Sequence, residues 1–185
     1  HFRAGSMTKS LVATVVLQLV AEGRLALSDT LERWLPGILA YGDQVSIRQL
    51  LGHTSGVPHD WATIERALYG SPQERLHAWT PQALVALVAD RPPNFPPGTA
   101  WSYSNTGYIL LGLVVETAGG ATLAQELQRR IVEPLGLRHT HLPGDARELP
   151  VPMSRGYSLR VGPGGEVLHG PLLDFTVQNP SWAWA

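Results

Sequence analysis

The spacing of hydrophobic residues predicts a mostly helical chain. The first strong helical segment begins near Ser6 and ends at Gly23, because apolar residues recur three and four positions apart and glycine often follows the last turn of a helix. A second long apolar segment covers residues 104–118 and is followed by two glycines. Helices therefore dominate the predicted fold up to about Val132.

Shorter helices are predicted wherever a capping residue precedes a helical pattern. Four such starts lie in the sequence, at Asp29, Ser46, Thr80 and Thr122. At the first of them, Asp29 and Glu32 are interpreted as helix caps rather than as a catalytic pair of carboxylates.

The last part of the chain, residues 143–185, is rich in glycine and proline. It contains one predicted hairpin, with arms at Tyr157–Val161 and Glu166–His169 and a glycine-rich turn at residues 162–165. The sequence has no internal repeat, low-complexity segment or domain boundary. We therefore expect residues 1–185 to belong to a single domain.

Composition narrows the classes of protein that fit the sequence. The chain has 185 residues, 44% hydrophobic and 16% charged, as in a globular domain with a lightly charged surface. Its net charge of −1 gives no electrostatic basis for binding nucleic acid or a membrane surface. The absence of cysteine excludes disulfides, thiolate nucleophiles and cysteine-ligated metals. The apolar run 11–20 is too short to span a bilayer, so we expect no stable membrane insertion from it.

Ser6 and Lys9 form an S-x-x-K motif at the start of the first apolar helix. Residues three positions apart are neighbours on a helix surface, with Cβ atoms roughly 5–6 Å apart, so the amine can reach the hydroxyl. A serine becomes an effective nucleophile when a nearby base takes its proton, and a lysine in a dry pocket can be that base. The alternative is a serine that caps the helix beside a solvated lysine.

Tyr103, Ser104 and Asn105 form a second cluster, at a turn that leads into the second long helix. Asn105 offers both a donor and an acceptor there. A tyrosine near a lysine can share one proton with it, because the ammonium stabilises a phenolate. The alternative is a buried aromatic residue followed by a helix cap at Ser104 or Asn105. Trp101, two residues before Tyr103, is either a substrate-contacting or a core residue.

The two clusters together resemble the motifs of the penicillin-recognising serine hydrolases. In that family an S-x-x-K motif is joined to Y-x-N and to a later K-T-G or H-x-G. The form Tyr103-Ser104-Asn105 resembles class C β-lactamases and low-molecular-mass D-alanyl-D-alanine carboxypeptidases. The likeness extends over nearly the whole chain, through residues 50–56, 97–98, 107–112 and 134–137.

This resemblance implies a role for each site residue. Ser6 would attack a carbonyl and form an acyl-enzyme, and Lys9 would help to remove the Ser6 proton. Tyr103 would carry protons as general base and then as general acid to the leaving amine. Asn105 would bind the substrate carbonyl and orient Lys9, while Trp101 would contact substrate. The resemblance implies no metal or organic cofactor.

The family's third motif has no good match in this sequence. His139-Thr140-His141 lacks the glycine, and His169-Gly170 lacks the middle residue and falls in a predicted loop. By resemblance, the chain is an internal part of an α+β domain of the β-lactamase/transpeptidase type, truncated at both ends and without most of its antiparallel sheet. We therefore expect the apolar face of the Ser6 helix to lie in water, and the chain by itself to be poorly stable and weakly active.

Seven histidines require metal binding to be considered. His139 and His141 could clamp a zinc ion on a strand, but the sequence has no H-E-x-x-H motif and no acidic partner near them. We therefore expect no metal site. His53 lies in a His-Thr-Ser-Gly segment that lacks the G-x-S-x-G elbow, and by resemblance it supports the loop behind the active site.

The function that the resemblance implies is an acyl-enzyme serine hydrolase. The leading hypothesis is a D-alanyl-D-alanine carboxypeptidase-like peptidase that acts on cell-wall peptides in the periplasm or outside the cell. A class C-type β-lactamase, a related esterase or D-aminopeptidase, and a non-catalytic penicillin-binding or sensor protein are the alternatives. The expected ligands are accordingly a D-Ala-D-Ala peptide, a β-lactam or an ester.

Overall fold

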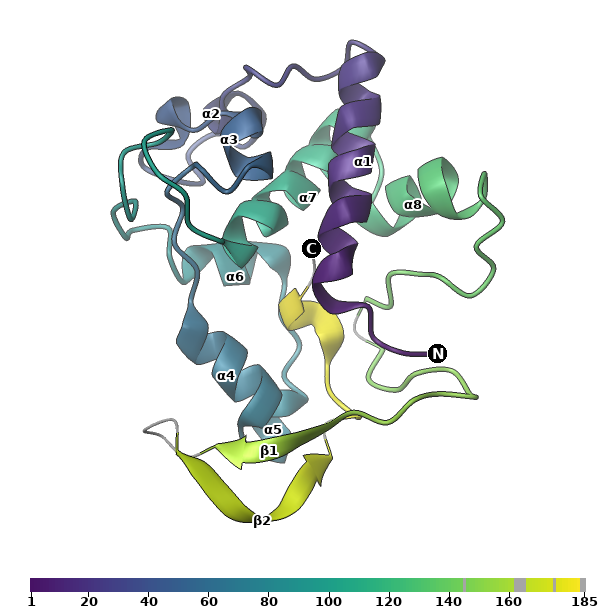
Figure 1. Ribbon diagram of the computed structural model, residues 1–185. Helices are drawn as coiled ribbons and strands as arrows, with labels where there is room; N and C mark the ends of the chain where they lie inside the picture. Colours follow the sequence, from purple (N-terminus) through teal and green to yellow (C-terminus); the bar gives the residue numbers. More distant parts are fainter. Residues whose placement is uncertain (145, 162–165, 175, 184–185) are drawn as a thin grey trace.

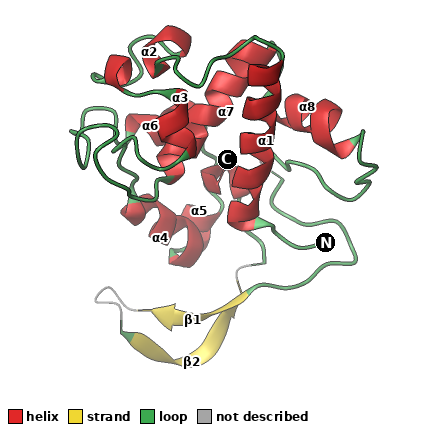
Figure 2. Cartoon of the chain, turned by 45° about the horizontal axis from the view of Figure 1, so that its top comes forward, coloured by secondary structure: helices red, strands yellow, loops and turns green. Residues whose placement is uncertain are grey.

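Helix α7 (Asn105–Gly119) forms the centre of the fold, and most of its residues are buried. The computed structural model describes residues 1–144, 146–161, 166–174 and 176–183. Helices surround α7 and a hairpin extends from the helical body, as Figures 1 and 2 show, which confirms the mostly helical prediction. In chain order the other helical elements are η1 (Gly5–Met7), α1 (Thr8–Ala21), α2 (Leu31–Trp34), η2 (Gly42–Gln44), α3 (Ile47–Leu51), α4 (Trp61–Tyr69), α5 (Pro72–Arg75), α6 (Pro81–Ala86), α8 (Leu123–Leu127), η3 (Gln128–Val132) and η4 (Pro180–Ala183).

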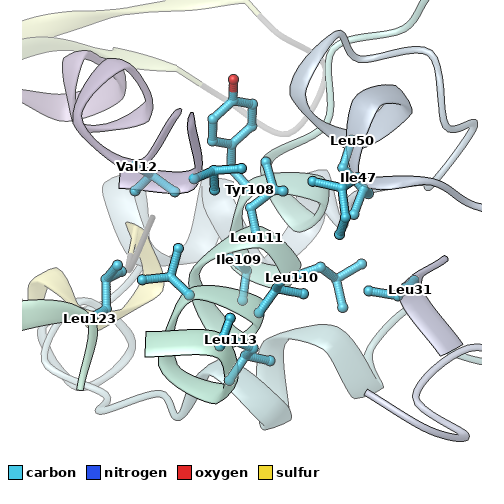
Figure 3. Close-up of a cluster of buried hydrophobic side chains, with 14 of the residues drawn as sticks. Val12, Leu31, Ile47, Leu50, Tyr108, Ile109, Leu110, Leu111, Leu113 and Leu123 are labelled. Carbon is cyan, nitrogen blue, oxygen red and sulfur yellow. The ribbon is translucent and has the colours of Figure 1, made fainter. Parts of the chain in front are cut away.

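The hydrophobic core lies around α7. Side chains from four other helices surround the α7 residues 109–113 in Figure 3, among them Val12, Leu31, Leu50 and Leu123, all of them fully buried. This packing fixes the relative positions of α1, α3 and α7, the helices that hold the candidate site described below.

Helix α1 packs against α7 and buries one apolar face. Val12, Val15, Val16 and Leu19 have no exposed surface, and burial of each such side chain contributes roughly 1.5–3 kcal/mol. The expectation that this face would lie in water was wrong, because α7 is apolar around most of its circumference and covers it in place of a sheet. Leu17, on the other side of α1, is half exposed.

Three of the four predicted helix starts are confirmed. Ser46 and Thr122 each accept a hydrogen bond from the backbone N–H three residues later, within capping boxes that open α3 and α8. Thr80 caps α6 in the same way, with proline at the first helical position. The capping residues in the sequence therefore predicted correctly where these short helices begin.

At the fourth start a short helix, α2, is present as predicted, but the predicted cap is wrong, because Asp29 does not cap α2. Thr30 is the residue before the helix, and its side chain makes no capping bond. The buried Asp29 carboxylate instead accepts hydrogen bonds from the side chains of Arg33 and Trp34 and from a backbone N–H. Three donors compensate the desolvation of a buried carboxylate better than one cap bond does. Glu32 accepts from the Gly37 backbone N–H after the helix, so it supports the C-terminal turn.

Two helices, α4 and α5, were not predicted, although each has a local start signal. The Asp60 side chain accepts from the backbone N–H of Thr63 at the start of α4. Ser71 opens α5 with a capping box and a following proline. Both helices are short and expose most of their residues. In α4 the apolar residues Trp61, Ile64 and Leu68 do recur at helical spacing, so this helix could have been predicted from the sequence.

The hairpin consists of β1 (Tyr157–Val161) and β2 (Val167–Asp174), paired antiparallel. The first arm matches the prediction, and the second is longer than predicted. The expected turn at residues 162–165 lies outside the described residues. Because β2 runs to Asp174, His169 and Gly170 lie in a strand and not in the predicted loop.

Within the described part of the chain, no single helix has the length and apolarity needed to cross a membrane, whereas α7 with the segment Leu123–Val132 passes that test as a bent pair.

Candidate active site

Ser6 lies in the turn that opens the first helix. The helical segment begins with the 3-10 turn η1, which contains Ser6, and continues as α1 from Thr8. Ser6 is exposed, whereas Lys9, one turn further along, is buried with 8% of its surface accessible. An exposed hydroxyl beside a buried amine is the arrangement that the S-x-x-K motif predicts, and it excludes the alternative of a solvated lysine.

The segment before α7 reaches both of these residues. The Tyr103 hydroxyl donates a hydrogen bond to Ser6 Oγ at 2.9 Å. Lys9 Nζ donates to Asn105 Oδ1 at the same distance of 2.9 Å. The structure therefore brings Ser6, Lys9, Tyr103 and Asn105 into one site, from two helix N-termini that are far apart in the sequence.

Ser104 explains how Tyr103 and Asn105 both face α1. It is buried, has extended backbone angles, and accepts the Gly107 N–H at 3.0 Å on its Oγ. The hydroxyl thus caps α7, as the alternative interpretation of this cluster expected. The cap and the site are compatible, because Ser104 ends the extended segment that carries Tyr103 and begins the helix that carries Asn105.

Two tyrosine rings surround the Lys9 ammonium. Its Nζ lies 5.1 Å from the centre of the Tyr103 ring and 5.6 Å from that of Tyr108, within the range of cation–π attraction. The Tyr108 hydroxyl donates to the Leu51 carbonyl, which connects α7 to α3. Sequence reasoning did not single out Tyr108, although its position three residues after Asn105 places both residues on one face of α7.

His53 lies behind Tyr103. Its ring centre is 4.5 Å from that of Tyr103 and 5.1 Å from that of Tyr108, and its Nδ1 accepts the Ser104 backbone N–H at 3.2 Å. Burial, together with the positive charge of Lys9, lowers the pKa of His53 below its ordinary value. The imidazole is therefore neutral at neutral pH.

Trp101 lies at the surface and not in the core. Its side chain is 64% exposed, and its ring lies at 77° to the His53 ring with 6.1 Å between the centres. An open cleft of about 440 Å³ adjoins the same segment and is lined by, among others, Trp61, Arg91 and Ser102. This volume falls in the range of small-molecule sites.

The other candidate histidines are remote from these residues or exposed. His139 and His141 are exposed and lie near the ring of His1. His169 is exposed on strand β2, in the hairpin that extends from the helical body (Figure 2). Within the ranges that the structure describes, no group of three or more His, Asp or Glu residues is arranged to hold a metal ion.

Comparisons with known proteins agree with this geometry. The family model described as Beta-lactamase matches residues 1–169. The chain is 35% identical to esterase EstB of Burkholderia gladioli over 196 residues, covering 88% of this chain and 49% of the esterase. It is 34% identical to penicillin-binding protein 4* of Bacillus subtilis over 143 residues, covering 76% of this chain and 30% of that protein.

A solved structure is similar over nearly the whole chain. The D-stereospecific amidohydrolase from Streptomyces superposes with a TM-score of 0.89 at 40% identity, covering 98% of this chain and 54% of that one. The chain thus spans about half the length of such relatives, or less. It belongs to the β-lactamase family of serine, penicillin-recognising hydrolases.

Proposed function

We propose that the protein hydrolyses amide bonds through an acyl-enzyme on Ser6. The observation that carries this proposal is the hydrogen bond of 2.9 Å between the Tyr103 hydroxyl and Ser6 Oγ. It places a proton carrier within the reach that general acid–base catalysis needs. The lysine–asparagine pair beside it supplies the positive charge that stabilises a phenolate.

The proposed reaction has two halves. In the first, Ser6 Oγ bonds to the carbonyl carbon and its proton passes to the Tyr103 oxygen. For this step Tyr103 must first give up its own proton, so that the hydrogen bond in which its hydroxyl donates to Ser6 Oγ is reversed. The C–N bond then breaks, and Tyr103 returns the proton to the leaving amine. In the second half, water adds to the acyl carbon and Ser6 leaves with a proton. Tyr103 is thus base and then acid.

Asn105 and Trp101 are proposed to bind the substrate. Because Asn105 Oδ1 accepts from Lys9, the amide N–H2 of the same side chain is the group that donates to a substrate carbonyl. The exposed indole of Trp101 offers a flat apolar surface beside the site. The backbone N–H of Ser6, at the start of a helical segment, is proposed to bind the developing oxyanion.

We propose that the substrate carries a D-configured residue. Relatives named as a D-stereospecific amidohydrolase, a D-amino acid amidase and putative D-alanyl-D-alanine carboxypeptidases support this choice. The narrower hypothesis remains a carboxypeptidase of cell-wall peptides, which would place the protein outside the cytoplasmic membrane. The second candidate is an ester hydrolase, favoured by the 35% identity to esterase EstB.

A matched set of substrates tests the proposal. We expect release of ammonia from D-phenylalanine amide, or of D-alanine from a diacetyl-lysyl-D-Ala-D-Ala peptide, with the L-phenylalanine amide cleaved far more slowly. The Ser6→Ala variant should release neither. Rapid hydrolysis of p-nitrophenyl butyrate without amide cleavage would favour the esterase. Amide cleavage that survives Ser6→Ala would contradict the proposal.

A further inference from the structure

We propose that His53 is a positioning residue of this site: its neutral imidazole and its backbone carbonyl hold Tyr103 in place against Ser6. The inference rests on the proposed function, because it assigns His53 an effect on a reaction that Tyr103 carries out. Among the described residues, Ser6 accepts its hydrogen bond from Tyr103, and His53 does not bond to it. His53 acts on Tyr103, which is the residue that contacts Ser6.

His53 holds the backbone on both sides of Tyr103. Its carbonyl oxygen accepts the Ser102 N–H at 3.0 Å, and its Nδ1 accepts the Ser104 N–H at 3.2 Å. The first bond fixes the Trp101–Ser102 peptide and the second fixes the Tyr103–Ser104 peptide, so together they set the direction of the Tyr103 Cα–Cβ bond relative to α1. The second bond is specific for the neutral ring, because only an unprotonated Nδ1 can accept it.

The imidazole also packs against the ring that it positions. The His53 and Tyr103 rings are tilted by 33° with 4.5 Å between centres, and the Tyr108 ring lies at 5.1 Å with a tilt of 39°. Tyr108 is itself fixed through its hydroxyl on the Leu51 carbonyl. The phenol that contacts Ser6 thus has an anchored ring stack behind it.

The backbone at His53 is held in an uncommon conformation. With φ of 57°, His53 is the one non-glycine residue in the described ranges with a positive φ. This left-handed conformation is unfavourable for most side chains, although histidine and asparagine are enriched there. It follows directly on the end of α3 and turns the His53 carbonyl and ring toward the Tyr103 segment. Such strain at a site is consistent with a functional demand on the geometry.

Protonation of His53 would dismantle this arrangement. The titratable groups that face its ring are Lys9 of α1, Tyr103, and Tyr108 of α7. An imidazolium would place a second cation near Lys9 and would turn the Nδ1 acceptor into a donor that faces the Ser104 N–H. Burial and Lys9 lower the pKa of His53, so the neutral form prevails at neutral pH and is lost as the pH falls through that lowered value.

The first test is the pH dependence of p-nitrophenyl butyrate hydrolysis by the wild type and by His53→Asn. Asparagine tolerates the positive φ and offers an oxygen near the position of Nδ1, but it has no ring and does not titrate. For His53→Asn we expect a kcat about tenfold below that of the wild type and a KM within about twofold of it. In the wild type the rate should fall at acidic pH as His53 is protonated, and this fall should be absent from the pH profile of the variant. His169→Asn, an exposed histidine on the hairpin, is the matched control and should match the wild type.

A double-mutant cycle tests whether His53 acts through Tyr103. In a Tyr103→Phe background, His53→Asn should lower the residual rate by less than about twofold, because the group that it positions has already lost its hydroxyl. Equal effects of His53→Asn in both backgrounds would overturn the inference, since they would indicate a general loss of structure.

A measurement on the wild type covers the case in which the variant does not fold. Histidine-selective ¹⁵N labelling distinguishes the two ring nitrogens, and we expect His53 with its proton on Nε2 at pH 7. An imidazolium or a proton on Nδ1 would overturn the inference.

Labelling of Ser6 by a fluorophosphonate separates the two proposals: a reactive wild type with an unchanged His53→Asn variant refutes only the role of His53. An unreactive wild type refutes the hydrolase proposal and the role of His53 with it.

Discussion

The Tyr103 hydroxyl lies 2.9 Å from Ser6 Oγ, although the two residues are 97 positions apart in the sequence. This contact exists because α1 and α7 pack side by side and bring their N-terminal ends to one surface (Figure 1). Each helix contributes one pair: Ser6 and Lys9 from the first, Tyr103 and Asn105 from the start of the second. The candidate chemistry of the chain thus depends on the packing of its two long apolar helices.

Removal of the Tyr103 hydroxyl should slow acylation and leave the fold intact. We expect Tyr103→Phe to react with a fluorophosphonate about 10²- to 10⁴-fold more slowly, the range in which general acid–base groups contribute. The ring contacts with His53 and Lys9 do not require the hydroxyl, so the melting temperature should stay close to that of the wild type. Tyr69→Phe, on the exposed side of α4, is the control. A rate within tenfold of the wild type would remove Tyr103 from the mechanism.

Lys9 is the only lysine in the chain, so its substitution tests the amine without a second candidate. Lys9→Met keeps the length and burial of the side chain but removes its charge and its bond to Asn105. Lys9→Arg keeps a charge but replaces the compact ammonium with a larger, planar guanidinium, which does not fit the same buried position between Asn105 and Tyr103. We expect both variants to lose at least about 10²-fold in the acylation rate. Full activity of Lys9→Arg would show that the site needs a charge alone.

The ion cluster at α8 should matter more for stability than for activity. Glu126 is fully buried and accepts hydrogen bonds from Arg129 and Arg130, and Arg130 also pairs with the exposed Glu22 after α1. Breaking a buried pair typically costs about 3–5 kcal/mol, so Glu126→Gln should lower the free energy of unfolding by about 3 kcal/mol. Glu22→Gln, at the exposed end of the same arginine, is the matched control and should cost far less. Urea unfolding of both variants measures the difference, and equal losses would contradict this account.

Asp60 should make the stability of α4 depend on pH. Burial alone would raise the pKa of Asp60, but its hydrogen bonds from Thr63 and Arg91 outweigh burial and hold the pKa below its ordinary value. A carboxyl whose pKa is lowered by folding stabilises the protein above its unfolded pKa of about 3.9, and the contribution is lost as the pH falls through the folded value.

Asp60→Asn keeps a capping oxygen and removes the charge. We therefore expect its melting temperature to be a few degrees below that of the wild type at pH 7. This difference in melting temperature should shrink below about pH 4, as Asp60 of the wild type is protonated. Asp43→Asn, an exposed aspartate in η2, should show no gap at either pH. A gap that is independent of pH would mean that packing, and not charge, is the cause.

The sequence predicted best what local chemistry determines. Capping residues such as Ser46 and Thr122 placed helix starts, because a cap bond spans three residues and needs no tertiary contact. That the residues of the two motifs form one site was predicted only from their resemblance to a family, since no local pattern indicates that Tyr103 contacts Ser6. The comparisons then confirmed the family, and the roles of the individual residues stay proposals.

What the sequence missed depends on packing between distant segments. Asp29 has the local pattern of a cap, yet burial beside Arg33 and Trp34 gives it better donors. The burial of the α1 face was misjudged because the apolar surface of α7 was not recognised as a substitute for a sheet. The placement of Tyr108 behind Tyr103 likewise follows from the packing of α3 on α7, which no periodicity reveals. The placement of His53 behind the site was expected, but only through the resemblance to a family.

The most direct test of the central claim is the intact mass of the protein after incubation with a slow-turnover penicillin, beside a Ser6→Ala control. If Ser6 is the nucleophile of an acyl-transfer site, one molecule of penicillin will add per protein chain, the adduct will map to the peptide that contains Ser6, and the control will stay unmodified. An adduct that persists in Ser6→Ala, or that maps to another residue, would contradict the account.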